Sequence, residues 1–286
     1  MPEGIPCPKF RVADEQYISV RKGMMSQRIL PYDDISSDYI LMLDDDVELL
    51  PDSVEKLIRE AEDHNTDLLG VDTFQNHQLP FSSKVQAAIA NFVFPHFSKK
   101  WAFKIHNNGS FSYIHNPRKN YYPSQSCAGN AMLWKTESYK KLQMQDELWL
   151  DSLPFAYCDD MLESYKVYKN GLKLGVVFNS GIRHIDLKSA SSGYHSNPDK
   201  IKIRTTAQLA VWWRTCYNPG NSNLWKKSEA SASFSIKMVW QSIMFLSLSI
   251  VKANFSYISN FIKGAAEGWN FVNSESFKNL PPYVIK

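Results

Sequence analysis

A run of three aspartates directly after an apolar segment constrains the fold of this 286-residue chain more than any other feature. The apolar residues 39–43 (YILML) have the length of a buried strand, and Asp44, Asp45 and Asp46 follow them. Strands contain few aspartates, and three neighbouring carboxylates repel one another. The sequence therefore predicts a strand that ends at this run, and a positive charge that balances the run.

The residues after the aspartates predict an α/β fold. An amphipathic helix is expected after Pro51, and a second strand over residues 67–74. The apolar positions of that helix are Val54, Leu57, Ile58 and Ala61. Strand, helix and strand in this order form the unit of a parallel sheet flanked by helices, and such sheets bind ligands at the carboxyl ends of their strands.

Further elements follow from the same patterns along the chain. Helices are expected over residues 82–95, 136–142, 159–170, 200–216 and most of 231–263, and strands over residues 126–134 and 172–178. Residues 99–123 are polar, aromatic and rich in Asn, which is typical of a long irregular loop.

Composition argues against several classes of protein. The net charge is +3 and the basic residues are dispersed, so we expect no nucleic-acid partner. Four scattered cysteines without a CxxC pair indicate free thiols in a reducing cytosol instead of a zinc site. The first ten residues lack the pattern of a signal peptide, and we expect a cytoplasmic protein.

The spacing of the aspartates predicts a metal site. In strand geometry Asp44 and Asp46 point to one side and Asp45 to the other. Mg²⁺ binds one or two carboxylates together with substrate phosphates, and Mn²⁺ prefers similar donors. A divalent cation would relieve the repulsion within the pair. The alternative is a solvated acidic turn that caps the following helix.

Several segments resemble family 2 glycosyltransferases, which have the GT-A fold. The segment YILMLDDDVEL resembles the DXD segment of that family, and KGMMSQRIL, with Gly23 and Arg28, looks like the segment before it. CAGNAMLWKTESYKKL is similar to the acceptor-side strand and helix of the family. AYCDDMLESYKVYKNGLKLGVV resembles the acidic-pair segment, although Lys166 replaces the usual Arg, and GIRHIDLKSASSG resembles the His segment. The similarity runs from about residue 17 to about residue 220.

The resemblance implies a fold and a reaction. The expected fold is α/β, with a GT-A-like mixed, mainly parallel sheet flanked by helices. The expected activity is an inverting, metal-dependent hexosyl transfer, with Mg²⁺ or Mn²⁺ as cofactor. The donor would be a nucleotide sugar, and the acceptor a hydroxyl of a glycan or lipid-linked molecule, as in polysaccharide biosynthesis.

The resemblance also assigns roles to individual residues. Asp160 would be the general base, with Asp159 beside it, and simple capping of the helix is the alternative for this pair. Asp46, Asp44 and His184 would form the metal site. The donor nucleotide would contact Asp44, Asp45, Arg28 and Arg204. Arg214, on the same predicted helix as Arg204, is expected on a solvated face.

The expected organisation is a catalytic domain over residues 1–225 and a helical segment over residues 226–286. A complete domain of this family begins with further strands that hold the nucleotide, and we expect these leading strands to be missing from the chain. A truncated, non-catalytic interaction protein is therefore an alternative function. A metal-dependent phosphoesterase is a third function, but the further His and Asp clusters of two-metal sites are not evident.

The C-terminal segment suggests contact with a membrane. Residues 231–269 are mostly apolar and are flanked by lysines, the pattern of a helix that lies at a membrane interface. The longest uncharged stretch, residues 238–251, is shorter than the roughly 20 residues of a membrane span. We expect peripheral contact with the inner face of the membrane, and packing onto the catalytic domain is the alternative.

Overall fold

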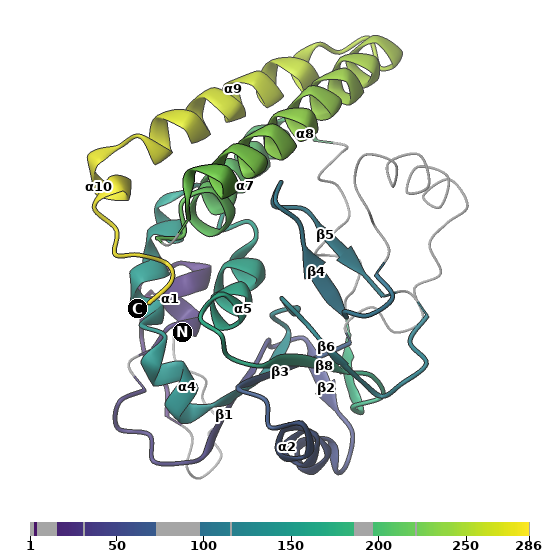
Figure 1. Ribbon diagram of the computed structural model, residues 1–286, viewed down its shortest axis with the longest axis vertical. Coiled ribbons are helices and arrows are strands. Elements are labelled where there is room, and N and C mark those ends of the chain that lie inside the picture. The colour runs from purple at the N-terminus through teal and green to yellow at the C-terminus, as the bar shows by residue number, and fades with distance from the viewer. Residues whose placement is uncertain are drawn as a thin grey trace.

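A mixed sheet with helices on both faces forms the body of the molecule, and long helices cover one end (Figure 1). The computed structural model describes residues 3–4, 16–30, 32–72, 98–114, 116–185, 197–220 and 222–285. The helix expected over residues 82–95 lies outside these ranges. The predicted α/β class is confirmed.

The central sheet has the strand order β1, β7, β3, β8, β6 in the described part of the chain. These strands are β1 (Tyr39–Leu43), β7 (Ala131–Lys135), β3 (Leu68–Val71), β8 (Leu174–Val177) and β6 (Tyr121–Pro123). Only β3 and β8 pair in parallel; the other three pairings of these strands are antiparallel. The sheet is mixed as expected, but it is mostly antiparallel instead of mainly parallel, because β7 lies between β1 and β3.

Two apolar cores lie on the two faces of this sheet. Helix α2 (Ser53–His64) covers one face, where Leu57 and Ala61 pack against Leu69 of β3. The larger core lies on the other face and includes Trp134 of β7 and residues of helix α5 (Asp159–Lys169). The amphipathic helix was correctly predicted except at Val54, which is 40% exposed.

Residues 99–123, expected to be an irregular loop, contain a hairpin. Its strands β4 (Phe103–Ile105) and β5 (Phe111–Tyr113) have only three residues each. Two hydrogen bonds from later parts of the chain hold the tip of the hairpin. Trp212 Nε1 donates to the carbonyl of Asn107 at 2.8 Å, and Lys237 Nζ donates to the carbonyl of Asn108 at 3.1 Å. Strands this short give no clear periodicity in the sequence, so long-range contacts decide their conformation.

Several short elements complete the body of the molecule. They are α1 (Met24–Arg28), the antiparallel pair β2 (Val47–Leu49) and β9 (Ile182–His184), α4 (Thr136–Lys141) and the 3₁₀ helix η1 (Met144–Ser152).

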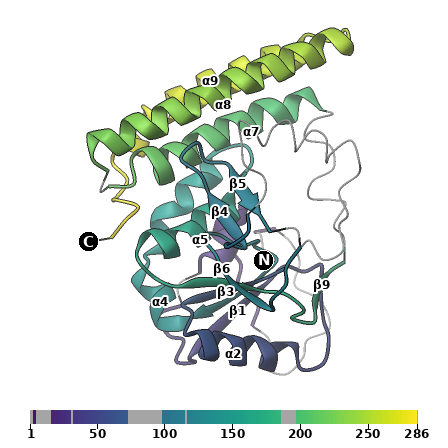
Figure 2. The same cartoon turned by 45° about the vertical axis from the view of Figure 1, so that its right-hand side comes forward.

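The long helices form a layered end of the molecule. Helix α7 (Pro198–Trp212) continues into a π-helical turn, η2 (Trp213–Tyr217), and is followed by α8 (Leu224–Val251), α9 (Ser256–Val272) and α10 (Glu275–Lys278). Helices α8 and α9 form the outermost layer, and α7 lies between them and the body (Figure 2). Residues on both sides of the predicted boundary at residue 225 share one core, because Phe234 of α8 stacks on Trp212 at 3.9 Å.

A buried ion-pair cluster joins this end to the body. Glu147 of η1 pairs with Lys166 of α5 at 2.9 Å and with Arg214 of η2 at 2.8 Å. Tyr283, which is fully buried, donates a 2.6 Å hydrogen bond to the carbonyl of Leu162. The expectation that Arg214 lies on a solvated face is wrong: only 5% of it is exposed, since Glu147 supplies its counter-charge.

Lys237 makes the stability of the fold depend on pH. Burial, reinforced by the charge of the nearby Arg204, lowers the pKa of Lys237 to about 8. Between pH 8 and the ordinary lysine pKa, the unfolded chain binds a proton that the folded chain does not, so stability rises with pH. We expect the free energy of unfolding to rise by about 2 kcal/mol between pH 8 and pH 9.5 because of this group.

Urea unfolding of Lys237→Met at both pH values tests this expectation, because the variant should lack the rise. Lys252→Met, at the exposed end of α8, is the control and should retain it. If the free energy of unfolding rises equally in Lys237→Met and in the unmodified chain, other groups cause the rise.

Candidate functional site

The pairing of β2 with β9 brings His184 to the acidic run. In this register Val47 lies opposite His184, and the amide of Ile185 donates to the carbonyl of Asp46 at 2.8 Å. The run itself leaves strand geometry, because Asp45 and Asp46 form the turn between β1 and β2. This turn, more than strand alternation, determines where the carboxylates point.

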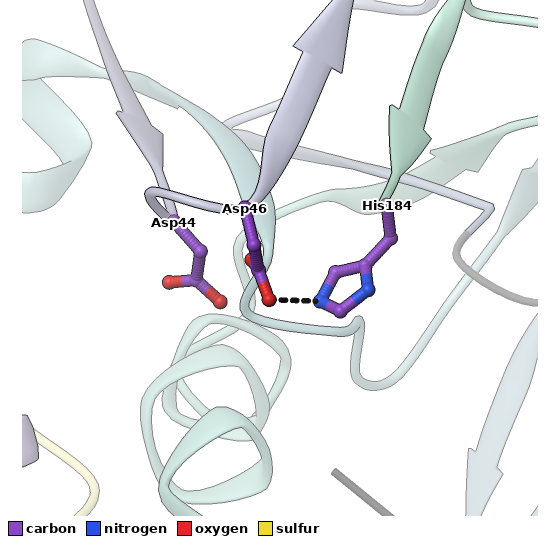
Figure 3. A group of neighbouring side chains, drawn as sticks. All are labelled: Asp44, Asp46 and His184. Atoms are coloured by element: carbon purple, nitrogen blue, oxygen red, sulfur yellow. Dashed lines mark ion pairs between the residues drawn. The ribbon is translucent and has the colours of Figure 1, made fainter. Parts of the chain in front are cut away.

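Asp44, Asp46 and His184 converge on one point (Figure 3). Each offers one ligand atom, and these atoms all lie within 4.8 Å of one another. His184 Nε2 lies 3.3 Å from Asp46 Oδ2, and only 9% of the His184 side chain is exposed. Its Nδ1 is buried without a hydrogen-bond partner among the described residues.

This donor set fits a divalent cation. Ligands on opposite sides of Mg²⁺, at 2.0–2.1 Å each, lie about 4.2 Å apart, so small side-chain movements would close the set. Two carboxylates and an imidazole suit Mg²⁺ or Mn²⁺ when phosphate oxygens complete the coordination. Asp44, Asp46 and His184 would hold the ion.

Arg28 joins the acidic run to the acidic pair of α5. Its Nη2 lies 3.1 Å from Asp44 Oδ1, and its Nη1 lies 2.7 Å from Asp159 Oδ2 and 3.4 Å from Asp160 Oδ1. One guanidinium therefore faces three carboxylates, and the surrounding negative charge exceeds its own. Such an excess favours a further cation at the same site.

Two glycines make room for this arrangement. A Cβ atom on Gly23 would lie 2.1 Å from Asp151, which accepts hydrogen bonds from the amides of Met25 and Ser26 at 3.0 and 2.8 Å. A Cβ atom on Gly129 would lie 2.6 Å from the guanidinium of Arg28. Asp151 thus fixes the start of α1, and Gly129 lets Arg28 at its end reach the carboxylates.

The two acidic residues of α5 have different environments. Asp159 is only 9% exposed in its side chain and makes the shorter contact to Arg28, whereas the Asp160 side chain is 41% exposed. Burial, reinforced by the charge of Asp160, raises the pKa of Asp159 well above its usual value. Asp159 therefore anchors Arg28, and Asp160 is the member that a bound molecule can reach.

The charges of the site act on one another. Burial lowers the pKa of Arg28, but Asp159 and the other carboxylates outweigh this effect and raise it, so the group stays charged. Burial also raises the pKa of Asp44, against the opposing effect of Arg28. A cation bound beside Asp44 would favour the ionised carboxylate and offset this burial.

Sequence reasoning missed Glu163 and Asp151. Glu163 is 2% exposed, and its Oε1 has no hydrogen-bond partner among the described residues. Burial raises its pKa to about 7, with Arg28 opposing and Asp160 adding to the rise. Its position four residues after Asp159, on the same helical face, was a usable signal. No local signal pointed to Asp151.

Two further residues, Asp45 and Arg204, were predicted to contact the donor. Asp45 is exposed on the turn. Arg204 lies on α7 with its guanidinium 5.1 Å from the centre of the Tyr157 ring, two residues before Asp159. The site thus combines a set of cation ligands with an exposed carboxylate that can accept a proton, an arrangement suited to a phosphate-bearing substrate.

Comparison with known proteins finds a family model that matches the first part of the chain. Residues 20–107 match the family model described as Glycosyl transferase family 2. No curated protein matches the chain. The matched range includes Arg28 and the acidic run, whereas Asp159, Asp160 and His184 follow it.

Proposed function

Because residues 20–107 match the model of glycosyl transferase family 2, we propose that this chain is a metal-dependent, inverting glycosyltransferase. It moves a sugar from a nucleotide-sugar donor to a hydroxyl group of a glycan or a lipid-linked acceptor. The sugar is a hexose, and the reaction serves polysaccharide synthesis on the cytoplasmic side of a membrane. The ion is Mg²⁺ or Mn²⁺.

The observation that carries this proposal is the bridge made by Arg28. It contacts Asp44 of the acidic run and Asp159 and Asp160 of α5 at the same time. Residues that would bind the diphosphate and a residue that would act on the acceptor therefore share one site. If the acidic run and the Asp159–Asp160 pair each only capped a helix, Arg28 would not need to contact both of them.

The proposed reaction is a single displacement. The acceptor oxygen bonds to the anomeric carbon on the face opposite the leaving group, and the bond from that carbon to the diphosphate oxygen breaks with its electron pair on the diphosphate. Asp160 takes the proton of the acceptor hydroxyl. Arg28 holds Asp159 and Asp44 in place. The divalent cation, when bound, supplies Lewis-acid stabilisation of the diphosphate charge.

Removal of one proposed ligand gives the direct test. We expect Asp46→Asn to weaken Mn²⁺-dependent binding of a nucleoside diphosphate about tenfold or more, because a neutral amide is a poorer cation ligand than a carboxylate. Isothermal titration calorimetry with UDP, and then GDP and CDP, each with and without Mn²⁺, measures the change.

Glu48→Gln is the matched control, since Glu48 is a carboxylate two residues away on β2 and is exposed outside the ligand set. Equal effects of the two substitutions, or nucleotide binding without Mn²⁺, would contradict the metal role. If the unmodified chain binds no nucleotide at all, the alternative of a non-catalytic interaction protein gains support.

A further inference from the structure

Helix α8 carries an exposed apolar stripe along its outer side. The stripe is formed by Ile236, Val239, Ile243, Leu246 and Ile250, each between 46% and 64% exposed. The spacing of three and four residues places these side chains on one side of the helix. Between Glu229 and Lys252 the only charged residue of α8 is Lys237, which is buried on the opposite side.

Helix α9 continues this surface. Phe255, just before the helix, and Ile262 and Trp269 within it recur every seven residues and are 63%, 59% and 54% exposed. Helices α8 and α9 run side by side along the outermost edge of the molecule (Figure 1). We call the combined surface the α8–α9 outer face. Exposed apolar side chains that gather on neighbouring helices mark an interaction site.

The charges around this face fit an anionic lipid surface. Lys226 and Lys227 lie at one end of α8, Lys252 at the other, and Lys263 is exposed on α9. Glu267 of α9 is paired with Lys202 at 2.7 Å, and Glu229, beside Lys226 and Lys227, is the other carboxylate of the two helices. An apolar face on helices whose ends carry basic residues is the pattern of helices that lie in the plane of a membrane.

The contacts of α8 favour a helix that lies on the membrane instead of crossing it. By length and composition alone α8 could cross a bilayer. However, Lys237 donates to the carbonyl of Asn108, and Phe234 stacks on Trp212 of α7. A crossing helix would break these contacts and place Lys237 in hydrocarbon, whereas a helix in the membrane plane retains them.

We propose that the α8–α9 outer face docks the protein flat on an anionic lipid bilayer. This inference does not depend on the proposed sugar transfer. The full chain should float with vesicles made of equal parts phosphatidylcholine and phosphatidylglycerol, and high salt should weaken but not abolish the binding. Extraction with alkaline carbonate should release the bound protein.

Substitutions on the α8–α9 outer face give the decisive comparison. Ile243→Glu removes an apolar contact and adds a charge, so we expect vesicle affinity to fall about tenfold or more. Val54→Glu is the control, because Val54 is exposed on α2 at the far end of the molecule from α8 and α9 (Figures 1 and 2). Val239→Glu serves as a second variant, and thermal unfolding checks that each variant is folded.

Four results would overturn the proposal. Absence of flotation by the unmodified chain would remove its basis, as would equal losses in Val54→Glu and in the two α8 variants. If the unmodified chain dimerises but does not bind vesicles, and Ile243→Glu abolishes the dimer, the face binds a second copy of the chain instead. Resistance to carbonate extraction would assign α8 to a membrane span.

Discussion

Asp160→Asn is expected to reduce kcat roughly 10²–10⁴-fold, the usual contribution of a positioned general base. An asparagine side chain cannot take the proton of the acceptor hydroxyl, yet it retains the size of aspartate. The 3.4 Å ion pair between Asp160 and Arg28 is the longest of the three ion pairs of Arg28. Donor affinity should therefore change little, and calorimetry with the nucleoside diphosphate and Mn²⁺ measures it beside steady-state kinetics.

Asp159→Asn gives the matched comparison for this prediction. Asp159 is buried and holds Arg28 at 2.7 Å, so its loss should disturb Arg28 and reduce both donor binding and turnover. If Asp160→Asn reduces donor binding as much as turnover, then Asp160 is a structural residue and the base lies elsewhere.

Glu147→Ala is expected to destabilise the fold by about 3–5 kcal/mol, the cost of breaking a buried ion pair from one side. Glu147 is fully buried, and its two oxygens accept hydrogen bonds from Lys166, Arg214 and Trp149. Without it, two buried cations lose their counter-charge. Thermal unfolding should show a midpoint lower by on the order of 10 °C.

The pH dependence of this effect provides its control. Burial tends to raise the pKa of Glu147, but hydrogen bonds from Arg214 and the charge of Lys166 lower it below the usual value. Glu147 therefore contributes its full stabilisation at pH values above its pKa in the unfolded chain. This contribution is lost as the pH falls through its lower pKa in the folded protein. The variant and the unmodified chain should converge on acidification.

Glu55→Gln serves as a surface control, because Glu55 forms an exposed pair with Arg59 and should contribute less than about 1 kcal/mol. A Glu147→Ala variant as stable as Glu55→Gln would show that the buried cluster can be replaced without cost.

Local patterns were sufficient for much of the fold. The strand β1, the helices α2 and α5 and the strand β8 were predicted close to their observed bounds, because each has a clear apolar period and a defined end. The insertion of β7 between β1 and β3 was not predictable, since strand order depends on contacts between distant segments. The β4–β5 hairpin was missed for the same reason.

Most residues of the site were predictable from the sequence, but the contacts between them were not. The sequence itself marked the acidic run, and the resemblance to family 2 glycosyltransferases added Arg28, Asp159–Asp160 and His184. No pattern showed that Arg28 would contact both acidic groups, because this contact depends on Asp151 and Gly129, which reach α1 and Arg28 from other parts of the fold. Arg214 was assigned to solvent because a helical pattern does not show that a buried Glu147 lies opposite it.

The contact between Tyr283 and the carbonyl of Leu162 has a consequence for synthesis of the chain. The two residues are separated by 121 positions, so at about 5–20 residues per second the ribosome makes Tyr283 roughly 6–24 s after Leu162. During this interval α5, which carries Asp159 and Asp160, lacks a core contact that it has in the finished protein. The proposed catalytic centre can therefore reach its final packing only after Tyr283 has been made.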